Sequence, residues 1–291
     1  MRVVIVGSTG MLGQQLVRAF SDDDVFAWGR AACDVTDAVA VREMICAAAP
    51  AIVINATAYN AVDRAEEEPE SANAVNGYAV GFLAEAAAAC GASFVHYSSD
   101  YVFGGGAAAL GAYPEDAEPC PISAYGRSKL LGEQELRRVA TAHPRLRWYC
   151  IRLSRLFGTA ARSAGAKRSF VELILERAAT TDRLEVVDGE CASPTYAPDL
   201  AVATRALISG TYANGIYHRT NDGACTWYAF AEAILARIGW QGELVAVPPS
   251  RFPRPAARPA SSVLVTTKLP PLQRWEDALA LFLAELARDT R

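Results

Sequence analysis

The sequence of 291 residues is poor in the side chains that build metal sites and disulfide frameworks. It contains three His residues, which are isolated from one another, and seven Cys residues without a CxxC pair. An odd number of widely spaced Cys residues argues against a disulfide framework and against a structural zinc site. Neither is expected to stabilise this chain.

Positive charge is not in excess either. Lys and Arg number 28 against 32 Asp and Glu, which gives a formal net charge of −4. A general nucleic-acid binder usually carries a basic excess, because it neutralises phosphates with Lys and Arg. The composition therefore disfavours nucleic acid as a partner.

Long apolar runs are also missing. No window approaches the roughly 18 apolar residues of a transmembrane helix, and the N-terminus has only residues 3–6 before a Gly, too few for a signal peptide. We therefore expect a cytoplasmic protein without a membrane partner. With 52% hydrophobic and 21% charged residues, the chain has enough apolar mass for a full core, which excludes intrinsic disorder.

Short apolar runs alternate with helical patterns in the first half of the sequence. The runs predict strands over residues 3–6, 51–54, 93–97 and 148–153. The patterns predict helices over residues 11–20, 39–48, part of 66–90, and 124–140. This alternation indicates βαβ units and an α/β fold with a doubly wound parallel sheet of the Rossmann type. We expect residues 1–153 to form the dinucleotide-binding core.

The second half is less regular. Its patterns predict helices over residues 170–179, 199–209, 228–238 and 276–287, and strands over residues 184–187, 215–218 and 244–247. Residues 248–259 contain too many prolines for a helix or an inner strand, so we expect an ordered loop there. Residues 154–291 are predicted to form mainly a smaller substrate-binding lobe, with some segments returning to the core. A cleft between the two parts would hold the substrate.

A glycine motif, G-x-x-G-x-x-G, follows the first predicted strand and precedes a helix. Gly7 permits a tight turn, Gly10 lets the backbone approach a pyrophosphate, and Gly13 lets the helix pack close to the strand. Free N–H groups and the positive end of the helix dipole then hold phosphates. This context predicts a dinucleotide site, which also includes Thr9, Met11 and Leu12.

The residues about 20 positions after the glycine motif, where the second strand of the βαβ unit should end, indicate which nicotinamide cofactor is bound. An NAD-selective site usually has an acidic residue there to hold the ribose 2′-OH. Residues 27–30 of this sequence end in Arg30, and the next carboxylate after them is Asp34. Because a guanidinium suits a 2′-phosphate, we predict NADPH, with NADH as a possible cofactor. Asp34 and Val35 are assigned to the same site.

A catalytic pattern follows in the middle of the chain. Tyr125 and Lys129 are four residues apart, so they share one face of the predicted helix. A nearby cation is expected to lower the pKa of the phenol. Ser99 follows a predicted parallel strand, at the carboxyl end where ligands bind in open α/β sheets. We predict that these three residues are catalytic.

Because it combines the glycine motif with Ser99, Tyr125 and Lys129, the sequence resembles the extended short-chain dehydrogenase/reductase family. The segments NATAYNAVDRAE (55–66) and SSDYVF (98–103) resemble those of the dTDP-4-dehydrorhamnose reductases. Segments at 215–218, 226–231 and 258–264 are also similar to that group. The resemblance covers nearly the whole chain.

The resemblance implies NADPH-dependent reduction of the 4-keto group of a dTDP-6-deoxy-4-ketohexose, as in the formation of dTDP-rhamnose. Tyr125 would protonate the alkoxide, Lys129 would hold the nicotinamide ribose and depress the pKa of Tyr125, and Ser99 would orient and polarise the carbonyl. The cofactor would also contact Ala56, Ala58 and Tyr59. The nucleotide sugar would face Asn60, Val62, Asp100 and Tyr101.

Three positions depart from the pattern of that group. Ser99 stands where Thr is common and keeps the hydroxyl. Gln15 stands where some members are described as binding magnesium with Glu at a dimer interface, so we expect no metal here. Arg155 stands where Trp is common, and we predict that it contacts the nucleotide sugar.

Two other functions remain open at this stage. A nucleotide-sugar epimerase with tightly bound NAD would return the hydride to its substrate. A non-catalytic regulatory subunit, of the type that serves methionine adenosyltransferase, shares the expected fold. The sequence leaves a monomer and a homodimer equally open.

Overall fold

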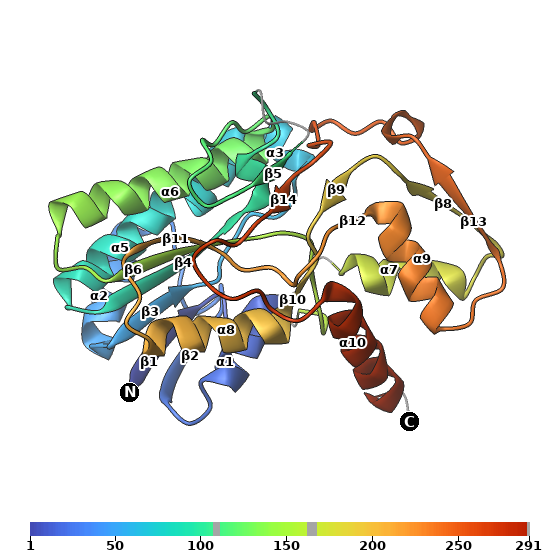
Figure 1. The fold of residues 1–291 in the computed structure, drawn as a ribbon. Helices are drawn as coiled ribbons and strands as arrows, with labels where there is room; N and C mark the ends of the chain where they lie inside the picture. The colour runs from blue at the N-terminus through green and yellow to red at the C-terminus, as the bar shows by residue number, and fades with distance from the viewer. Residues whose placement is uncertain (107–110, 162–167, 290–291) are drawn as a thin grey trace.

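The computed structural model describes residues 1–106, 111–161 and 168–289. A six-stranded parallel sheet forms its centre, in the order β11-β6-β4-β3-β1-β2 (Figure 1). Each neighbouring pair in this order is parallel. The strands are β1 (Arg2–Val6), β2 (Asp24–Trp28), β3 (Ile52–Asn55), β4 (Ser93–Ser99), β6 (Trp148–Leu153) and β11 (Gly215–His218).

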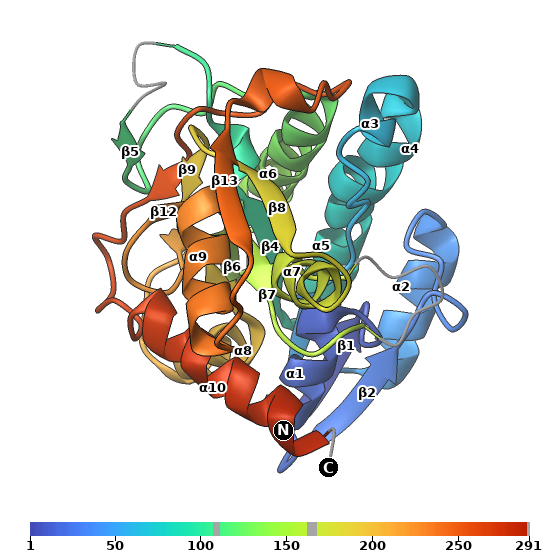
Figure 2. The same cartoon turned by 90° about the vertical axis from the view of Figure 1, so that its right-hand side faces the viewer.

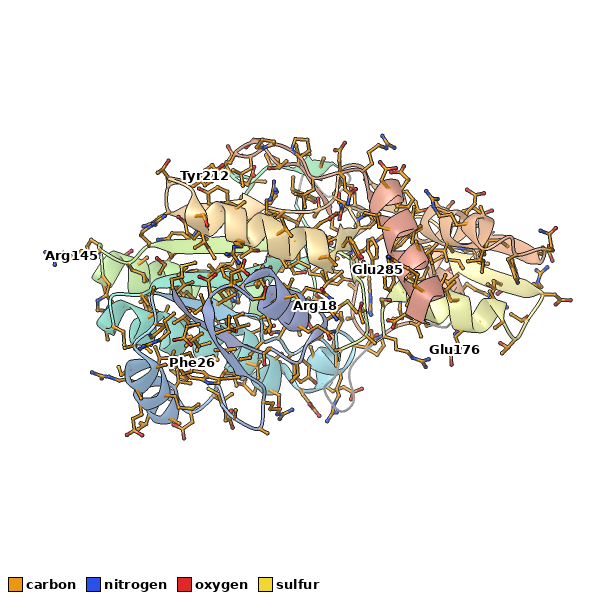
Figure 3. The ribbon with its side chains drawn as sticks, turned by 90° about the horizontal axis from the view of Figure 1, so that it is seen from below. Arg18, Phe26, Arg145, Glu176, Tyr212 and Glu285 are labelled. Carbon is orange, nitrogen blue, oxygen red and sulfur yellow. The ribbon has the colours of Figure 1, made fainter. Side chains whose placement is uncertain are left out.

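Helices cover both faces of the sheet. On one face lie α2 (Ala38–Ala48), α5 (Ala79–Ala89) and α6 (Ala124–Ala142). On the other lie α1 (Met11–Ala19) and α8 (Ala197–Ser209), seen from below in Figure 3, where Arg18 marks α1. Successive strand residues alternate between the two apolar clusters, as Val4 and Ile5 do. The predicted doubly wound Rossmann fold is confirmed.

A third apolar cluster lies outside the sheet, in the second half of the chain. It is built on Phe157, Phe230 and Phe282, which the structure buries completely. Around it lie α7 (Phe170–Ala178), α9 (Trp227–Arg237), α10 (Trp275–Asp289) and the parallel pair β8 (Arg183–Val187) and β13 (Glu243–Val247), which Figure 2 shows from the side.

Short elements complete the described chain. The helical ones are α3 (Arg64–Glu67), α4 (Pro69–Asn73), the π-helical turn η1 (Ala74–Tyr78), and the 3₁₀ turns η2 (Asp100–Val102) and η3 (Pro249–Arg251). The short strands are β5 (Ala112–Tyr113), β7 (Leu156–Phe157), β9 (Cys191–Ala192), β10 (Thr195–Tyr196), β12 (Cys225–Thr226) and β14 (Val263–Leu264). The Pro-rich segment 248–259 contains only η3 and is otherwise a loop, as predicted.

Two segments after residue 153 belong to the central sheet and its covering helices rather than to the third apolar cluster. The α8 helix packs beside α1, and β11 pairs with the free edge of β6. The chain therefore leaves the sheet after β6, forms part of the third apolar cluster, and returns to the sheet at β11 before it forms the remainder of that cluster.

Candidate active site

The glycine turn between β1 and α1 leaves no room for side chains. Gly7 has a φ of +83°, and a Cβ there would lie 2.8 Å from the carbonyl carbon of Ala56. A Cβ on Gly13 would lie 2.1 Å from the carbonyl oxygen of Gly7. Both contacts are shorter than real carbon atoms allow, so β1, α1 and the segment after β3 can approach this closely only with glycine.

The amino end of α1 has no side chain to cap it. Gly10 occupies the cap position, whereas Asp37 caps α2 and Ser123 caps α6 through side-chain oxygens. The first N–H groups of α1 are therefore left for another acceptor, at the positive end of the helix dipole. A dinucleotide pyrophosphate fits this arrangement. A hollow of about 240 Å³ adjoins the turn and is lined by Ser8, Thr9, Gln14, Val17, Arg18 and Ala27.

The turn after β2 carries Arg30 on the surface. Asp34 accepts hydrogen bonds from the N–H and the hydroxyl of Thr36, and these bonds lower the pKa of Asp34. Val35 is buried. No carboxylate lies at the end of β2 itself, and the guanidinium of Arg30 is the first charged group after this strand.

The segment after β3 is tied to α6 through one side chain that sequence analysis missed. The Asn76 amide accepts a bond from the N–H of Tyr59 (2.8 Å) and donates to the carbonyl oxygen of Tyr59 (3.1 Å). The same amide donates to the hydroxyl of Ser128 (2.9 Å). Ala56, Ala58 and Tyr59 are partly buried here. Asn76 thereby fixes the predicted cofactor segment relative to the helix of Tyr125.

The structure brings Ser99, Tyr125 and Lys129 together at the carboxyl end of β4. Each is at most 9% exposed. A side-chain hydrogen bond links Ser99 and Tyr125, and the Lys129 ammonium donates to the carbonyl oxygen of Tyr97 (2.6 Å). Burial lowers the pKa of Lys129 to about 8.

The pKa of Tyr125 moves in the direction opposite to the one expected from the sequence. Burial raises it, and the charges of Asp100 and Tyr101 add to the rise. The hydrogen bond with Ser99 acts in the other direction. The expectation of a lowered pKa was therefore wrong for this structure, because burial disfavours the charged phenolate and Lys129 is not among the groups that shift the pKa of Tyr125.

A buried ion pair, also missed from the sequence, lies one helical turn beyond Lys129. Arg152 donates from Nε to Oε1 of Glu133 (2.8 Å) and from Nη2 to Oε2 (2.7 Å). Both side chains are at most 2% exposed. Tyr125, Lys129 and Glu133 follow at four-residue intervals on α6, so the pair supports the helix face that carries the catalytic residues.

The predicted substrate residues occupy different surroundings. Asn60 is exposed and Val62 is half-buried. Tyr101 packs edge-on against Tyr125, with ring centres 5.5 Å apart. Asp100 is buried and accepts hydrogen bonds from serine hydroxyls.

Arg155 has a φ of +43° and reaches into the second half of the chain. It donates to the carbonyl oxygens of Cys225 (2.8 Å) and Glu190 (2.7 Å). Its guanidinium carbon also lies 3.9 Å from the ring centre of Trp227.

Two further ion pairs connect the segments around these residues. Arg258 donates from Nη2 to Oδ2 of Asp63 (2.7 Å), which joins the Pro-rich loop to the segment after β3. Arg254 pairs with Glu190, which also accepts from the indole N–H of Trp227 (3.1 Å). These partners are far apart in the sequence and gave no signal there.

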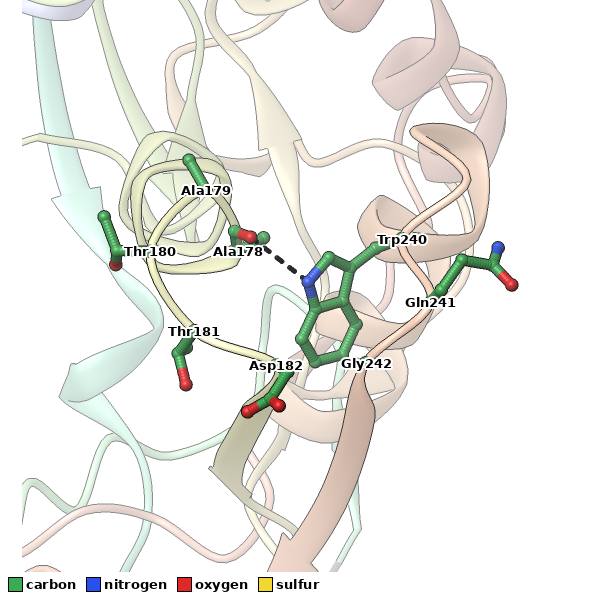
Figure 4. Close-up of a pocket in the computed structure, with 8 residues that line it drawn as sticks. All are labelled: Ala178, Ala179, Thr180, Thr181, Asp182, Trp240, Gln241 and Gly242. Carbon is green, nitrogen blue, oxygen red and sulfur yellow. Dashed lines mark hydrogen bonds between the residues drawn. The ribbon is translucent and has the colours of Figure 1, made fainter.

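A second hollow, of about 600 Å³, lies in the second half of the chain, between residues 178–182 after α7 and residues 240–242 before β13 (Figure 4). The indole N–H of Trp240 donates to the carbonyl oxygen of Ala178 across it (3.1 Å). Its lining includes none of the predicted site residues.

No group of three or more His, Cys, Asp or Glu side chains within 1–106, 111–161 and 168–289 is arranged to hold a metal ion. Gln15 is buried and accepts a bond from Arg18 (3.4 Å). No helix in the described part of the chain is long and apolar enough to cross a membrane.

Comparison with known proteins gives consistent matches. A family model described as the RmlD substrate binding domain matches residues 1–288. The chain is 34% identical to a dTDP-4-dehydrorhamnose reductase of Burkholderia thailandensis, covering 98% of this chain and 99% of the relative. It is 37% identical to such a reductase of Mycolicibacterium smegmatis, covering 96% and 84%. The crystal structure of dTDP-4-dehydrorhamnose reductase from Bacillus anthracis in complex with NADP aligns with a TM-score of 0.89 and 30% identity, covering 98% and 99%.

Proposed function

Because the chain belongs to the RmlD substrate binding domain family, we propose that it reduces the 4-keto group of a dTDP-6-deoxy-4-ketohexose with NADPH. The product would be a dTDP-rhamnose type of nucleotide sugar. The observation that carries the proposal is the meeting of Ser99, Tyr125 and Lys129 beside an uncapped, glycine-lined helix start.

NADPH supplies the hydride when it is bound. We propose that the backbone of Gly7, Thr9, Gly10, Met11, Leu12 and Gly13 holds its pyrophosphate, and that Arg30 holds its 2′-phosphate. Asp34, Val35, Ala56, Ala58 and Tyr59 would line the remainder of the site. The tight packing of the glycine turn and the free N–H groups of α1 support this assignment.

Tyr125 is the proposed proton donor to the oxygen on C4. Reduction leaves an alkoxide there, and a neutral phenol can protonate it. A raised pKa suits this role, because it keeps Tyr125 protonated before the reaction. Lys129, with its pKa near 8, would hold the nicotinamide ribose and stabilise the phenolate that forms. Ser99 would complete the hydrogen bonding around the reacting oxygen.

The nucleotide sugar would lie between the dinucleotide-binding core (1–153) and the mainly substrate-binding lobe (154–291). Asn60, Val62, Tyr101 and Arg155 are the proposed contacts. Asp100, also predicted from the sequence, accepts hydrogen bonds from three hydroxyl groups of the protein. We further propose that the enzyme acts in the cytoplasm, as a monomer or a homodimer.

The test is to incubate the protein with NADPH and a panel of 4-keto nucleotide sugars, and to follow the absorbance of the reduced nicotinamide. A reductase consumes NADPH in a one-to-one ratio with substrate. An epimerase consumes none, and a non-catalytic subunit turns over no ketosugar. The matched control is Tyr125→Phe, which keeps the ring and removes the acid, so kcat should fall by roughly 10²–10⁴-fold while NADPH still binds. A variant that retains more than about a tenth of the activity would assign the acid to another group.

A further inference from the structure

Three serine hydroxyl groups converge on the buried carboxylate of Asp100. Ser99 donates to Oδ1 (3.0 Å), while Ser154 (2.8 Å) and Ser262 (2.5 Å) donate to Oδ2. All four side chains are at most 7% exposed. An ionised carboxylate only accepts hydrogen bonds, and three donors on two oxygens favour this charged form. Burial raises the pKa of Asp100, and the three hydrogen bonds act in the opposite direction.

The three hydroxyl groups come from three separate parts of the chain. Ser99 ends β4, Ser154 follows β6, and Ser262 precedes β14, 162 residues after Asp100. The carboxylate therefore joins the sheet to a late segment of the second half. Both carboxylate oxygens accept hydrogen bonds from within the protein, and Asp100 is 3% exposed.

The hydrogen bond from Ser99 to Asp100 determines the orientation of the Ser99 hydroxyl. A hydroxyl has one hydrogen and two lone pairs. The hydrogen of Ser99 goes to Asp100, and one lone pair accepts from the N–H of Tyr101 (3.2 Å). While Asp100 holds this hydrogen, Ser99 cannot donate it to the phenol of Tyr125, and a hydrogen bond from Ser99 to that phenol lowers the pKa of Tyr125.

The charged groups around Tyr125 come from several elements. Asp100 and Tyr101 face it from η2, and Lys129 lies one turn further along α6. Arg155 faces Asp100 from the segment after β6, and Arg258 and Glu190 lie near Tyr101. Asp100 is the carboxylate that opposes a phenolate on Tyr125 most directly.

We propose that Asp100 is a positioning residue of this reductase, whose carboxylate holds the hydroxyl of Ser99 in one orientation beside Tyr125. The inference rests on the proposed function, because only the reductive direction requires the acid form of Tyr125. This role requires no contact between Asp100 and the sugar.

The test compares Asp100→Asn with Ser98→Ala across a pH series. Ser98 is the matched control, since it is a buried residue near the end of β4, two positions before Asp100, and its hydroxyl has no hydrogen-bond partner in the described part of the chain. Removing the charge of Asp100 should lower the pH at which kcat falls on the alkaline side of the profile by about one pH unit or more. KM for the ketosugar should stay within about twofold, because no contact with substrate is lost. Ser98→Ala should match the wild type.

A second readout does not depend on turnover. Titration of phenolate absorbance, with Tyr125→Phe subtracted in each background, reports the ionisation of Tyr125 alone. Asp100→Asn should move this titration in the same direction as the alkaline fall in kcat. If wild type turns over no ketosugar, the proposed function fails, but the titration still decides the role of Asp100.

Three results would overturn the proposal. One is a loss of kcat in Asp100→Asn in which neither the alkaline pH dependence of kcat nor the phenolate titration of Tyr125 changes. Another is a raised KM with unchanged kcat, which would make Asp100 a direct sugar contact. If Asp100→Asn does not fold, Ser99→Ala cuts the same link from the other end, and an unchanged kcat in that variant would be the third.

Discussion

The Glu133–Arg152 ion pair offers the sharpest test of how this core is held together. Glu133→Gln keeps the shape of the side chain but turns one of its two acceptors into a donor that faces the guanidinium. Both side chains are at most 2% exposed, so water cannot replace the lost partner. Breaking one partner of a buried pair costs about 3–5 kcal/mol, because the other charge remains buried. Since Gln retains one acceptor, we expect a loss of about 3 kcal/mol in the free energy of unfolding.

The same helix provides the control. Glu135 pairs with Arg138 at 2.8 Å, but Arg138 is 54% exposed. Exposed pairs contribute about 0–1 kcal/mol, so Glu135→Gln should change stability by no more than that. Urea titrations followed by circular dichroism measure both variants. If the two losses lie within about 1 kcal/mol of each other, burial does not set the strength of the Glu133–Arg152 pair and the reasoning fails.

Three other predictions concern the cofactor site and its lysine. Arg30→Ala should weaken NADPH binding by roughly 1.5–3 kcal/mol and leave NADH binding nearly unchanged, as measured by fluorescence titration; equal losses would remove Arg30 from the 2′-phosphate site. Gly13→Ala places a Cβ 2.1 Å from the carbonyl oxygen of Gly7, so it should destabilise the fold by roughly 1–3 kcal/mol and weaken both cofactors together. Burial lowers the pKa of Lys129 from 10.5 to about 8, so between these pH values the unfolded chain binds more protons and Lys129 makes stability rise with pH. Comparison with Lys129→Met in urea titrations across this window should show a smaller rise in the variant, and equal slopes would contradict the lowered pKa.

Patterns among residues that are close in sequence were enough to predict the central sheet and part of the candidate active site. The glycine turn between β1 and α1 and the Tyr125–Lys129 spacing on α6 each depend on residues that are close in sequence. Strand and helix periodicity reports burial of neighbouring residues, so it also located β6 and α7 closely.

Contacts between distant segments gave no such signal. Asp63 meets Arg258 across 195 residues, and Asp100 meets Ser262 across 162. The direction of Arg155 was also hidden, because its φ of +43° turns the chain after β6 so that the side chain binds carbonyl oxygens of the second half. The pKa of Tyr125 was misjudged for a related reason, since its burial depends on the whole fold rather than on Lys129.

The late return of β11 to the sheet constrains how the chain can be cut and synthesised. By residue 153 five of the six central strands have been made, yet the outer edge of β6 stays open until residues 215–218 arrive. A fragment ending at residue 153 would present the N–H and C=O groups of a buried, apolar strand to other chains, which is a template for aggregation. On the ribosome the same edge must wait for more than 60 further residues, during which it is exposed to misfolding and to chaperones. A stable nucleotide-binding fragment would therefore have to carry β11 with it.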